Sequence, residues 1–428
     1  MGVLALKGRN NATVQSPLQG LGLGEAMIPG RCPGMVAYAH SGRLPSKLSR
    51  TFNPFRQMFP TMGIALAMMG FAACRKSDEP SGAETQRVVV YCSVDETYAR
   101  PILDEFQRAT GIAVTATFDT EAGKTTGLVN RIIAESGSGG SRADVFWSGE
   151  VFNTILLARQ GLLEPYDSPA AGDVPGDYRD SQHRWTGTAV RARVVAFDPK
   201  RTPAARVPKR WADFAKSEIA PRTAIANPLF GTTRGHMAAL FAVWGRERAT
   251  SFLRELRQGN VMVLDGNSAT VRAVAEGRAD FGWTDSDDVA AAKQAGWSIE
   301  SASPDFVNIP VPSPRPSPLE RERGNQDAHL EAEAEAEGEG EGTLLIPCTA
   351  SMLRRPPHPT QARRLVDYLV SADVERELAK SGSRNIPVRE AVRTEMGLTL
   401  PRHSRVDYQS VAEAMDSAVS TCREILLR

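Results

Sequence analysis

The sequence predicts an α/β protein built from two units, each with a parallel sheet. From Arg87 onwards, short apolar runs alternate with helix-like patterns, the order typical of strand–helix–strand crossovers. The same alternation starts again after residues 190–197. The chain has 428 residues, and about 350 of them follow its first apolar segment. That length is enough for two domains of ordinary size.

The first unit is predicted to begin with a buried strand at residues 88–92 (VVVYC), an unbroken apolar run. The helix that follows carries its apolar residues on one face and ends at Gly111. Pro101 either opens this helix or kinks it after a short first turn. The remaining predicted elements are strand 112–118, helix 128–134, strand 144–147 and helix 151–160.

The second unit follows a longer predicted strand at residues 190–197 (VRARVVAF). Strands are expected at 223–226, 261–264 and 280–283, and helices at 211–215, 235–244, 249–258 and 268–276. The chain then returns with a strand at 343–346. Three helices, 360–370, 372–381 and 408–427, are expected to cover the outside.

Residues 58–74 have the pattern of a secretory signal. Basic residues precede an apolar run that is too short to span a membrane as a mature helix, and small residues precede Cys74. The end of this run (FAAC) resembles a bacterial lipobox, in which the cysteine is lipidated, although Phe71 stands where Leu is usual. An ordinary signal peptide with a chance cysteine and a buried core helix are the alternatives. We therefore expect an exported protein with a lipid anchor at Cys74.

Three segments are expected to lack a packed structure. Residues 1–57 show no sustained periodicity, and Met35 and Met58 are alternative starts. Residues 75–86 are polar and predict a flexible tether. Residues 310–342 combine prolines with alternating glutamates, which predicts a disordered surface insertion; an acidic metal-buffering segment is the alternative.

Charge and motif content argue against several classes of protein. Basic and acidic residues nearly cancel (51 against 50), so the electrostatic footprint of a nucleic-acid binder is missing from the sequence. Cys92, Cys348 and Cys422 lack metal-site spacing and allow at most one disulfide. The sequence has no nucleophile elbow, zinc-binding helix motif or Walker loop, so an enzyme is not expected. His236 is the histidine of most interest, and a histidine near a helix start is its simpler interpretation.

Open α/β sheets bind ligands beyond the carboxyl ends of their strands, and these positions are unusually polar in the first unit. Glu96 also fits a capping box with Ser93, which is a purely structural interpretation. The candidates are Ser93, Asp95 and Glu96 after the first strand, Asp119, Thr120 and Glu121 after the second, and Ser148, Gly149 and Glu150 after the third.

In the second unit, the loop 227–233 (NPLFGTT) leads into a helix predicted to start at Gly235. A glycine followed by Thr232 and Thr233 offers backbone N–H groups, hydroxyls and the positive end of the helix dipole, which together favour an oxyanion. Ordinary N-capping explains one of the two threonines. Residues 265–268 (DGNS) repeat the arrangement before the next helix. The candidates here are Asn227, Thr232, Thr233, Asn267 and Ser268.

A third polar segment, residues 284–288 (TDSDD), follows the last strand of this unit. Its three carboxylates repel one another, an arrangement that occurs around a cation or at a helix N-terminus. The sequence leaves both interpretations open for Thr284, Asp285 and Asp287.

Taken together, these segments resemble the extracellular solute-binding proteins of bacterial ABC importers, in the group associated with ferric iron. The resemblance covers roughly residues 87–306 and 343–389. It is carried by VVVYCSVDETYARPILDEFQRATGI, ADVFWSGE, LLEPY, IANPLFGTT, DGNS, TDSDD, TLLIPCTASM and SRNIPVR.

The resemblance implies a two-lobed periplasmic-binding-protein fold with a ligand cleft between the lobes and two hinge strands, 190–197 and 344–350. It implies lobe 1 from residues 87–195, 284–309 and 343–352, lobe 2 from residues 196–283, and C-terminal helices from residues 353–428. The implied role is that of a monomeric substrate-binding lipoprotein, in the periplasm or at the cell surface, that delivers its ligand to an ABC permease and its ATPase. A ligand-sensing subunit with the same fold is an alternative.

The resemblance also implies ferric iron, Fe³⁺, as the transported ligand, often with a synergistic carbonate. Relatives hold the ion with adjacent tyrosines after the last strand of lobe 2, whereas this chain has TDSD there and no Tyr-Tyr pair anywhere. Because Fe³⁺ is a hard cation, oxygen ligands from Tyr91, Glu150, Asp285 and Asp287 are the candidates. The departure leaves open a phosphonate or phosphate ester, whose cationic group would face the aspartates.

Overall fold

The computed structural model describes residues 86–119, 126–306 and 342–428. Within these ranges, we find no helix with both the length and the apolar character needed to cross a membrane. Several expectations concern residues outside the described ranges: the N-terminal extension, the signal peptide with Cys74, most of the tether, Thr120, Glu121 and nearly all of the insertion.

Lobe 1 is built around β1 (Arg87–Cys92). This strand pairs in parallel with β2 (Ala113–Phe118) on one side and with β3 (Val145–Ser148) on the other. The connecting helices are α1 (Glu96–Thr110), α2 (Thr126–Ser136) and α3 (Val151–Arg159). The strands and helices predicted for this unit are confirmed, with small shifts in their bounds.

Helix α1 shows how the apolar pattern produces one of these elements. Its buried face contains Ile102, Leu103 and Phe106, which recur at helical spacing and pack on the sheet. Pro101 lies inside α1, after the first turn. The helix ends at Gly111, whose φ of 70° is in the left-handed region that favours glycine, as the sequence predicts.

Lobe 2 has three parallel strands in the order β7 (Met262–Leu264), β6 (Thr223–Ala226) and β8 (Phe281–Asp285). Its main helices are α4 (Gly231–Trp244), α5 (Arg246–Gln258), α6 (Asn267–Ala275) and α7 (Ser286–Gln294). α4 begins four residues before the predicted start at Gly235, so the Gly-Thr-Thr segment forms its first turn.

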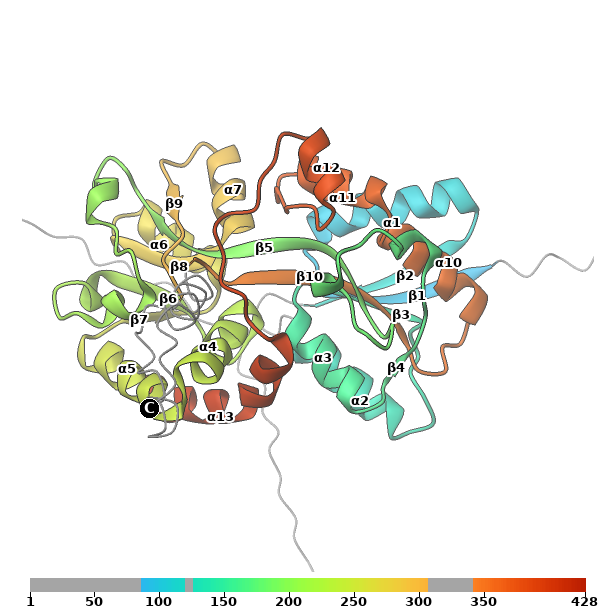
Figure 1. The fold of residues 1–428 in the computed structure, drawn as a ribbon, viewed down its shortest axis with the longest axis horizontal. Coiled ribbons are helices and arrows are strands. Elements are labelled where there is room, and N and C mark those ends of the chain that lie inside the picture. The colour runs from blue at the N-terminus through green and yellow to red at the C-terminus, as the bar shows by residue number, and fades with distance from the viewer. Residues whose placement is uncertain (1–85, 120–125, 307–341) are drawn as a thin grey trace, which may run out of the picture. The chain divides into compact units, whose positions relative to one another are not determined.

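The two lobes share the strand β5 (Thr186–Phe197). Its first part pairs with β10 (Leu345–Leu353) in lobe 1, and its second part pairs with β8 in lobe 2. At the crossing, the N–H of Arg193 donates a hydrogen bond of 2.9 Å to the carbonyl of Leu344. The predicted two-lobed α/β fold with two hinge strands is confirmed (Figure 1).

One expected boundary requires a correction. The sequence interpretation assigns residues 284–309 to lobe 1, but β8 continues to Asp285 inside the lobe 2 sheet. In addition, β9 (Glu300–Ala302) pairs with the lobe 2 half of β5. Residues 284–302 therefore belong to lobe 2, because strand pairing decides the lobe and the chain returns to lobe 1 only with β10.

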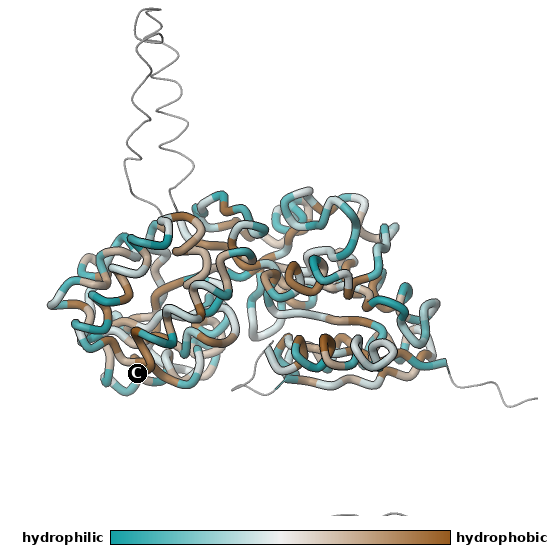
Figure 2. The backbone as a smooth tube through the Cα atoms, turned by 90° about the horizontal axis from the view of Figure 1, so that it is seen from below, coloured by the Kyte–Doolittle hydropathy of each residue, from teal (hydrophilic) through white to brown (hydrophobic). Residues whose placement is uncertain are grey.

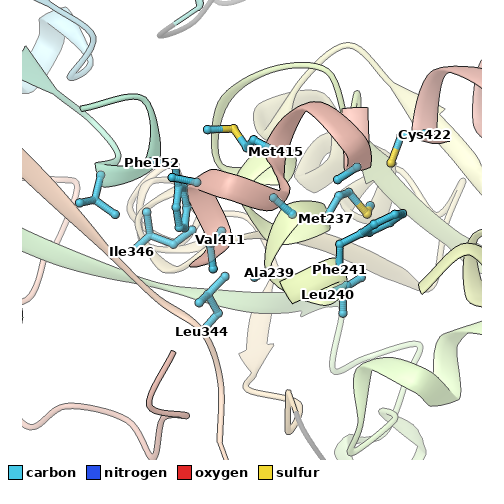
Figure 3. Packing of buried hydrophobic residues seen from close by; sticks show 14 of the residues in the cluster. Phe152, Met237, Ala239, Leu240, Phe241, Leu344, Ile346, Val411, Met415 and Cys422 are labelled. Carbon is cyan, nitrogen blue, oxygen red and sulfur yellow. The ribbon is translucent and has the colours of Figure 1, made fainter. Parts of the chain in front are cut away.

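The C-terminal helices divide into two groups. α10 (Pro359–Leu369), α11 (Ala372–Lys380) and the unpredicted α12 (Glu390–Glu395) belong to lobe 1. α13 (Tyr408–Leu426) packs on α3 of lobe 1 and on α4 and α5 of lobe 2 (Figure 1). Its apolar residues Val411, Met415 and Cys422 join the cluster that contains Met237 and Phe241 of α4 (Figure 3).

Hydropathy along the chain agrees with this packing. Figure 2 shows hydrophobic and hydrophilic stretches alternating along the backbone, and helices such as α1 and α10 bury one face and expose the other.

The ends that flank the inserted segment lie next to each other. The N–H of Phe306 donates to the carbonyl of Gly342 at 2.7 Å, and the indole N–H of Trp244 donates to the carbonyl of Phe306 at 3.0 Å. Thr343 pairs with His403 in an isolated bridge. The chain is thus held on both sides of the insertion by hydrogen bonds within the fold.

Candidate functional site

A cleft between the lobes opens beside the hinge strand β5. It lies beyond the carboxyl ends of parallel strands, the position at which α/β sheets bind ligands. The space among its lining residues amounts to about 530 Å³, which includes volume open to solvent. Its polar lining comprises Ser93, Gly149 and Glu150 from lobe 1, Arg191 from β5, and Asn227, Thr232, Thr233, Asp265, Asn267 and Asp288 from lobe 2.

Two helices of lobe 2 begin at this cleft. α4 follows Phe230 and α6 follows Gly266, and neither residue caps its helix with a side-chain hydrogen bond. Gly231, with a φ of 53°, occupies the left-handed region at the start of α4. The first-turn N–H groups have no acceptor within their own helix, and the helix dipole adds partial positive charge there. This side of the cleft is therefore suited to an anion.

Behind the cleft surface, Asp285 organises the polar groups of lobe 2. Its Oδ1 accepts a hydrogen bond from Arg193 Nη1 at 2.8 Å. Its Oδ2 accepts from Thr232 Oγ1 at 2.5 Å and from Asn267 Nδ2 at 3.0 Å. The hydroxyl group of Thr232 thus donates its proton to Asp285 inside lobe 2 and not to a ligand in the cleft. Thr233 has only long contacts, 3.4 Å from Arg193 and 3.5 Å to Asn267.

Arg191 connects the two lobes at the base of the cleft. Its Nη1 lies 2.9 Å from Asp287 Oδ2 in lobe 2, and its Nη2 donates to the carbonyl of Gly149 in lobe 1 at 2.7 Å. Burial opposes the charge of Arg191, but the groups around it, with Asp287 the strongest of them and Asp285 and Asp95 adding to it, together outweigh burial and raise the pKa of the guanidinium above its ordinary value. Arg191 therefore carries a positive charge at the cleft.

Glu150 lines the cleft but uses its carboxylate to cap α3. It accepts hydrogen bonds from the backbone N–H groups of Phe152 at 2.7 Å and of Asn153 at 3.2 Å. Burial raises the pKa of the Glu150 carboxyl, although these N–H groups and the charge of Arg234 favour the ionised form. A ligand would reach only the lone pairs that the helix leaves available.

Six of the nine residues predicted to bind ligand line the cleft: Ser93, Glu150, Asn227, Thr232, Thr233 and Asn267. The other three lie elsewhere. Asp95 immediately precedes α1, and Ser268 lies in the first turn of α6. Thr284 is buried in β8 and donates to Asp288 Oδ2 at 2.9 Å.

The four predicted metal ligands do not meet at one point. Glu150 lines the cleft, whereas Asp285 and Asp287 lie behind it, paired with arginines. Tyr91 belongs to the apolar cluster that includes α2 residues, where its hydroxyl donates to Glu135 at 2.7 Å. Arg131 lies over the Tyr91 ring, 4.6 Å from its centroid.

The acidic segment after β8 is compact. Oxygen atoms of Asp285, Asp287 and Asp288 lie within 4.8 Å of one another. Asp288 Oδ2 accepts from the N–H of Asp285 at 3.3 Å, which is a capping interaction at the start of α7. The position at a helix N-terminus thus accounts for Asp288. Asp285 and Asp287 are accounted for by their buried ion pairs with Arg193 and Arg191.

His236 lies in the core of lobe 2. Its ring packs against Trp211 and Trp283, with centroids 4.4 and 5.3 Å away. Burial lowers the pKa of His236 well below its ordinary value, and the nearby charge of Arg193 acts in the same direction. The imidazole is therefore neutral at pH 7.

Sequence reasoning missed the arginines of the site. Arg191 and Arg193 sit at alternate positions of an otherwise apolar strand, and Arg234 lies in a largely buried helix. Charged residues at such positions need buried partners, so the pattern VRARVV was the signal that buried acidic residues must lie beside this strand.

The chain matches a family model described as bacterial extracellular solute-binding protein over residues 88–384. It is 30% identical over 197 residues to the Fe(3+)-binding periplasmic protein of Serratia marcescens, covering 46% of this chain and 56% of that protein. It is 27% identical over 198 residues to the major ferric iron-binding protein of Neisseria gonorrhoeae, covering 45% and 57%. The chain thus spans a little over half the length of these curated relatives.

Solved structures show the same fold at low identity. Apo ferric ion-binding protein A of Pasteurella haemolytica superposes with a TM-score of 0.64 at 20% identity, covering 80% of this chain and 98% of that one. The periplasmic binding protein AfuA of Actinobacillus pleuropneumoniae, with fructose-6-phosphate bound, gives 0.63 at 16%, covering 80% and 99%. With the two lobes, the hinge strands and the cleft, the family match shows that this chain belongs to the bacterial extracellular solute-binding proteins.

Proposed function

We propose that this chain is the solute-binding component of an ABC importer. The observation that carries the proposal is a polar cleft lined from both lobes and from the strand that connects them. A ligand in such a cleft is fully surrounded only when the lobes close, so binding favours the closed arrangement. The closed chain would then meet a membrane permease, whose ATPase subunit supplies the energy for release.

The proposed location is the periplasm or cell surface, with a lipid anchor at Cys74, which lies outside the described residues. A tether of this kind raises the effective concentration of a monomeric binder near the permease. A lipobox cysteine carries several acyl chains, and stable anchoring needs more than one.

For the ligand, we propose ferric iron bound together with an oxyanion such as carbonate. The names of the relatives in Serratia and Neisseria support the ion. The first turns of α4 and α6, Thr233 and Arg191 would hold the anion. Carboxylates lining the cleft, from Glu150, Asp265 and Asp288, are the hard oxygen donors nearest to it.

A phosphonate or phosphate ester is the second candidate. One observation favours it: Asp285 and Asp287 are paired with Arg193 and Arg191 and do not line the cleft, so the metal would lose two of its expected ligands. An anion held by N–H groups, hydroxyls and Arg191 does not need Asp285 or Asp287 as ligands. Asp265 and Asp288 would then face a cationic group of the same molecule.

Thermal unfolding of the purified protein tests both ligands. One titration adds Fe³⁺ as a soluble chelate with bicarbonate, and a parallel titration adds a small panel of phosphate esters and phosphonates. A specific ligand at a hundred times its Kd stabilises the folded state by about 2.7 kcal/mol. A saturable rise with iron alone selects the first ligand, and a rise with the organic anions alone selects the second. No rise with either would contradict both.

A further inference from the structure

The lobes touch each other close to the cleft, through α3 of lobe 1 and α4 of lobe 2. Gly235 of α4 approaches the ring of Phe152 so closely that a Cβ at this position would overlap the ring. Phe152 also lies beside Tyr408 of α13, with ring centroids 6.0 Å apart, in the cluster shown in Figure 3. A change in the angle between the lobes must alter this contact.

Arg234 crosses the same contact with a charged side chain. Its Nη1 donates to Oδ1 of Asn153 in α3 at 3.0 Å. Asn153 is 1% exposed and Arg234 is 9% exposed, so water is largely excluded from this hydrogen bond. Two carboxylates favour the charged form of Arg234: Glu150, at the start of α3, and Asp416 of α13, whose Oδ1 lies 4.0 Å from Nη2.

Arg234 does not line the cleft, but its neighbours in α4 do. Thr232 and Thr233 precede it directly and form the lobe 2 wall. On the lobe 1 side, Glu150 lines the cleft and also caps the helix that carries Asn153. The cross-lobe hydrogen bond thus joins the helices on which the two walls are built.

We propose that Arg234 is a positioning residue that holds α4 of lobe 2 against α3 of lobe 1, so that the ligand-free chain favours the closed arrangement and binds its ligand more tightly without touching it. Opening would break the hydrogen bond to Asn153 and move Arg234 away from Glu150. A ligand that binds only the closed arrangement has an affinity proportional to the population of that arrangement. Loss of a hydrogen bond to a charged group is expected to lower the ratio of closed to open chains on the order of tenfold, and the affinity falls with the closed population.

Small-angle X-ray scattering of the ligand-free protein tests the proposal, with the full chain compared between variants. Arg234→Met is expected to increase the radius of gyration, because the open arrangement becomes more populated. Asn153→Ala, on the other lobe, is expected to have the same effect. The double variant should open no further than either single variant, because both changes remove one hydrogen bond.

Arg246→Met is the matched control. Arg246 also belongs to a lobe 2 helix and also contacts α13, through Ser417 Oγ at 3.1 Å, but its hydrogen bond does not reach lobe 1. Its scattering should equal that of the unaltered protein. A radius of gyration for Arg234→Met and Asn153→Ala that matches this control would overturn the proposal.

Folding of the variants is checked by circular dichroism. Should Arg234→Met fail to fold, Asn153→Ala and Arg234→Lys decide the outcome, since both make smaller changes at the same contact. The proposal rests on lobe closure, which is part of the proposed function. Because scattering is measured without ligand, its result does not depend on whether the ligand is iron or an organic anion. If the protein binds a ligand saturably but the variants scatter like the unaltered protein, only the proposed role of Arg234 is contradicted and the proposed function stands.

Discussion

Arg193 and Asp285 form an ion pair inside lobe 2, with 2.8 Å between Nη1 and Oδ1 and both side chains 0% exposed. Arg193 belongs to the strand that joins the lobes, and Asp285 ends the last parallel strand of lobe 2. The pair therefore fixes the sheet at the point where lobe 2 meets the hinge. It also sets the positions of Thr232 and Asn267 at the cleft.

Removing one partner of this pair should destabilise the protein strongly. Asp285→Ala leaves the Arg193 charge buried without its carboxylate, and we expect a loss of about 3–5 kcal/mol in the free energy of unfolding. Urea unfolding at pH 7 measures it. Asp280→Ala, which breaks the partly exposed pair with Arg222, is the control and should lose about 0–1 kcal/mol. Equal losses in the two variants would contradict this account of the buried pair.

The two threonines of α4 should respond differently to replacement by valine. Thr232→Val removes a donor to buried Asp285 and should lower the free energy of unfolding by about 1–3 kcal/mol. Thr233 has only long contacts, so Thr233→Val should change stability little and weaken ligand binding on the order of tenfold. Urea unfolding and titration with the ligand that stabilises the protein separate the two effects. Unchanged affinity in Thr233→Val would remove this hydroxyl from the proposed anion site.

A methyl group at Gly235 should force the two helices apart. Glycine to alanine normally stabilises a helix, but here the added Cβ overlaps the Phe152 ring. We therefore expect Gly235→Ala to destabilise the fold by about 1–3 kcal/mol, the range for overpacked cores. Thermal and urea unfolding measure this change. Phe152→Leu in the same chain should restore part of the loss, and an additive loss in the double variant would show that the two residues do not compete for space.

His236 should make stability depend on pH below neutrality. Its pKa in the folded chain is well below 6.5, so the unfolded chain binds a proton that the folded chain does not. Stability is then nearly complete at pH 7.5 and falls as the pH decreases through 6.5, by about 1.4 kcal/mol in total between pH 7.5 and 5.5. Urea unfolding between pH 7.5 and 5.5 measures the slope. His236→Phe should flatten it, and an unchanged slope would assign the dependence to other groups.

The fold was largely predictable from the sequence because its signals are local. The unbroken run that becomes β1, the stop at Gly111 and the repeated strand–helix order all follow from apolar spacing and backbone preference. The boundary between the lobes was not predictable in the same way. Residues 284–302 pair with β5 and β6 over long sequence distances, and no local pattern states which sheet a strand will join.

The candidate site was predictable as a set of loops but not as a set of contacts. Ser93, Glu150 and Asn267 follow strands or begin helices, so position alone identified them. Tyr91 illustrates the limit. Neighbouring side chains of a strand point to opposite faces, and the face that carries Tyr91 packs against α2 rather than toward the cleft. Asp285 and Asp287 pair with Arg193 and Arg191 of β5, which lies about ninety residues earlier in the chain, so no local pattern identified these partners.

The hydrogen bond between Phe306 and Gly342 has an evolutionary consequence. It joins the residues on either side of positions 307–341, so the described fold is closed at this place by its own backbone. Additions and deletions between these two residues are therefore nearly neutral for folding. Orthologues should differ widely in length at this place while keeping the residues on either side, and a shortened or foreign sequence placed there should leave the hinge and the cleft as they are.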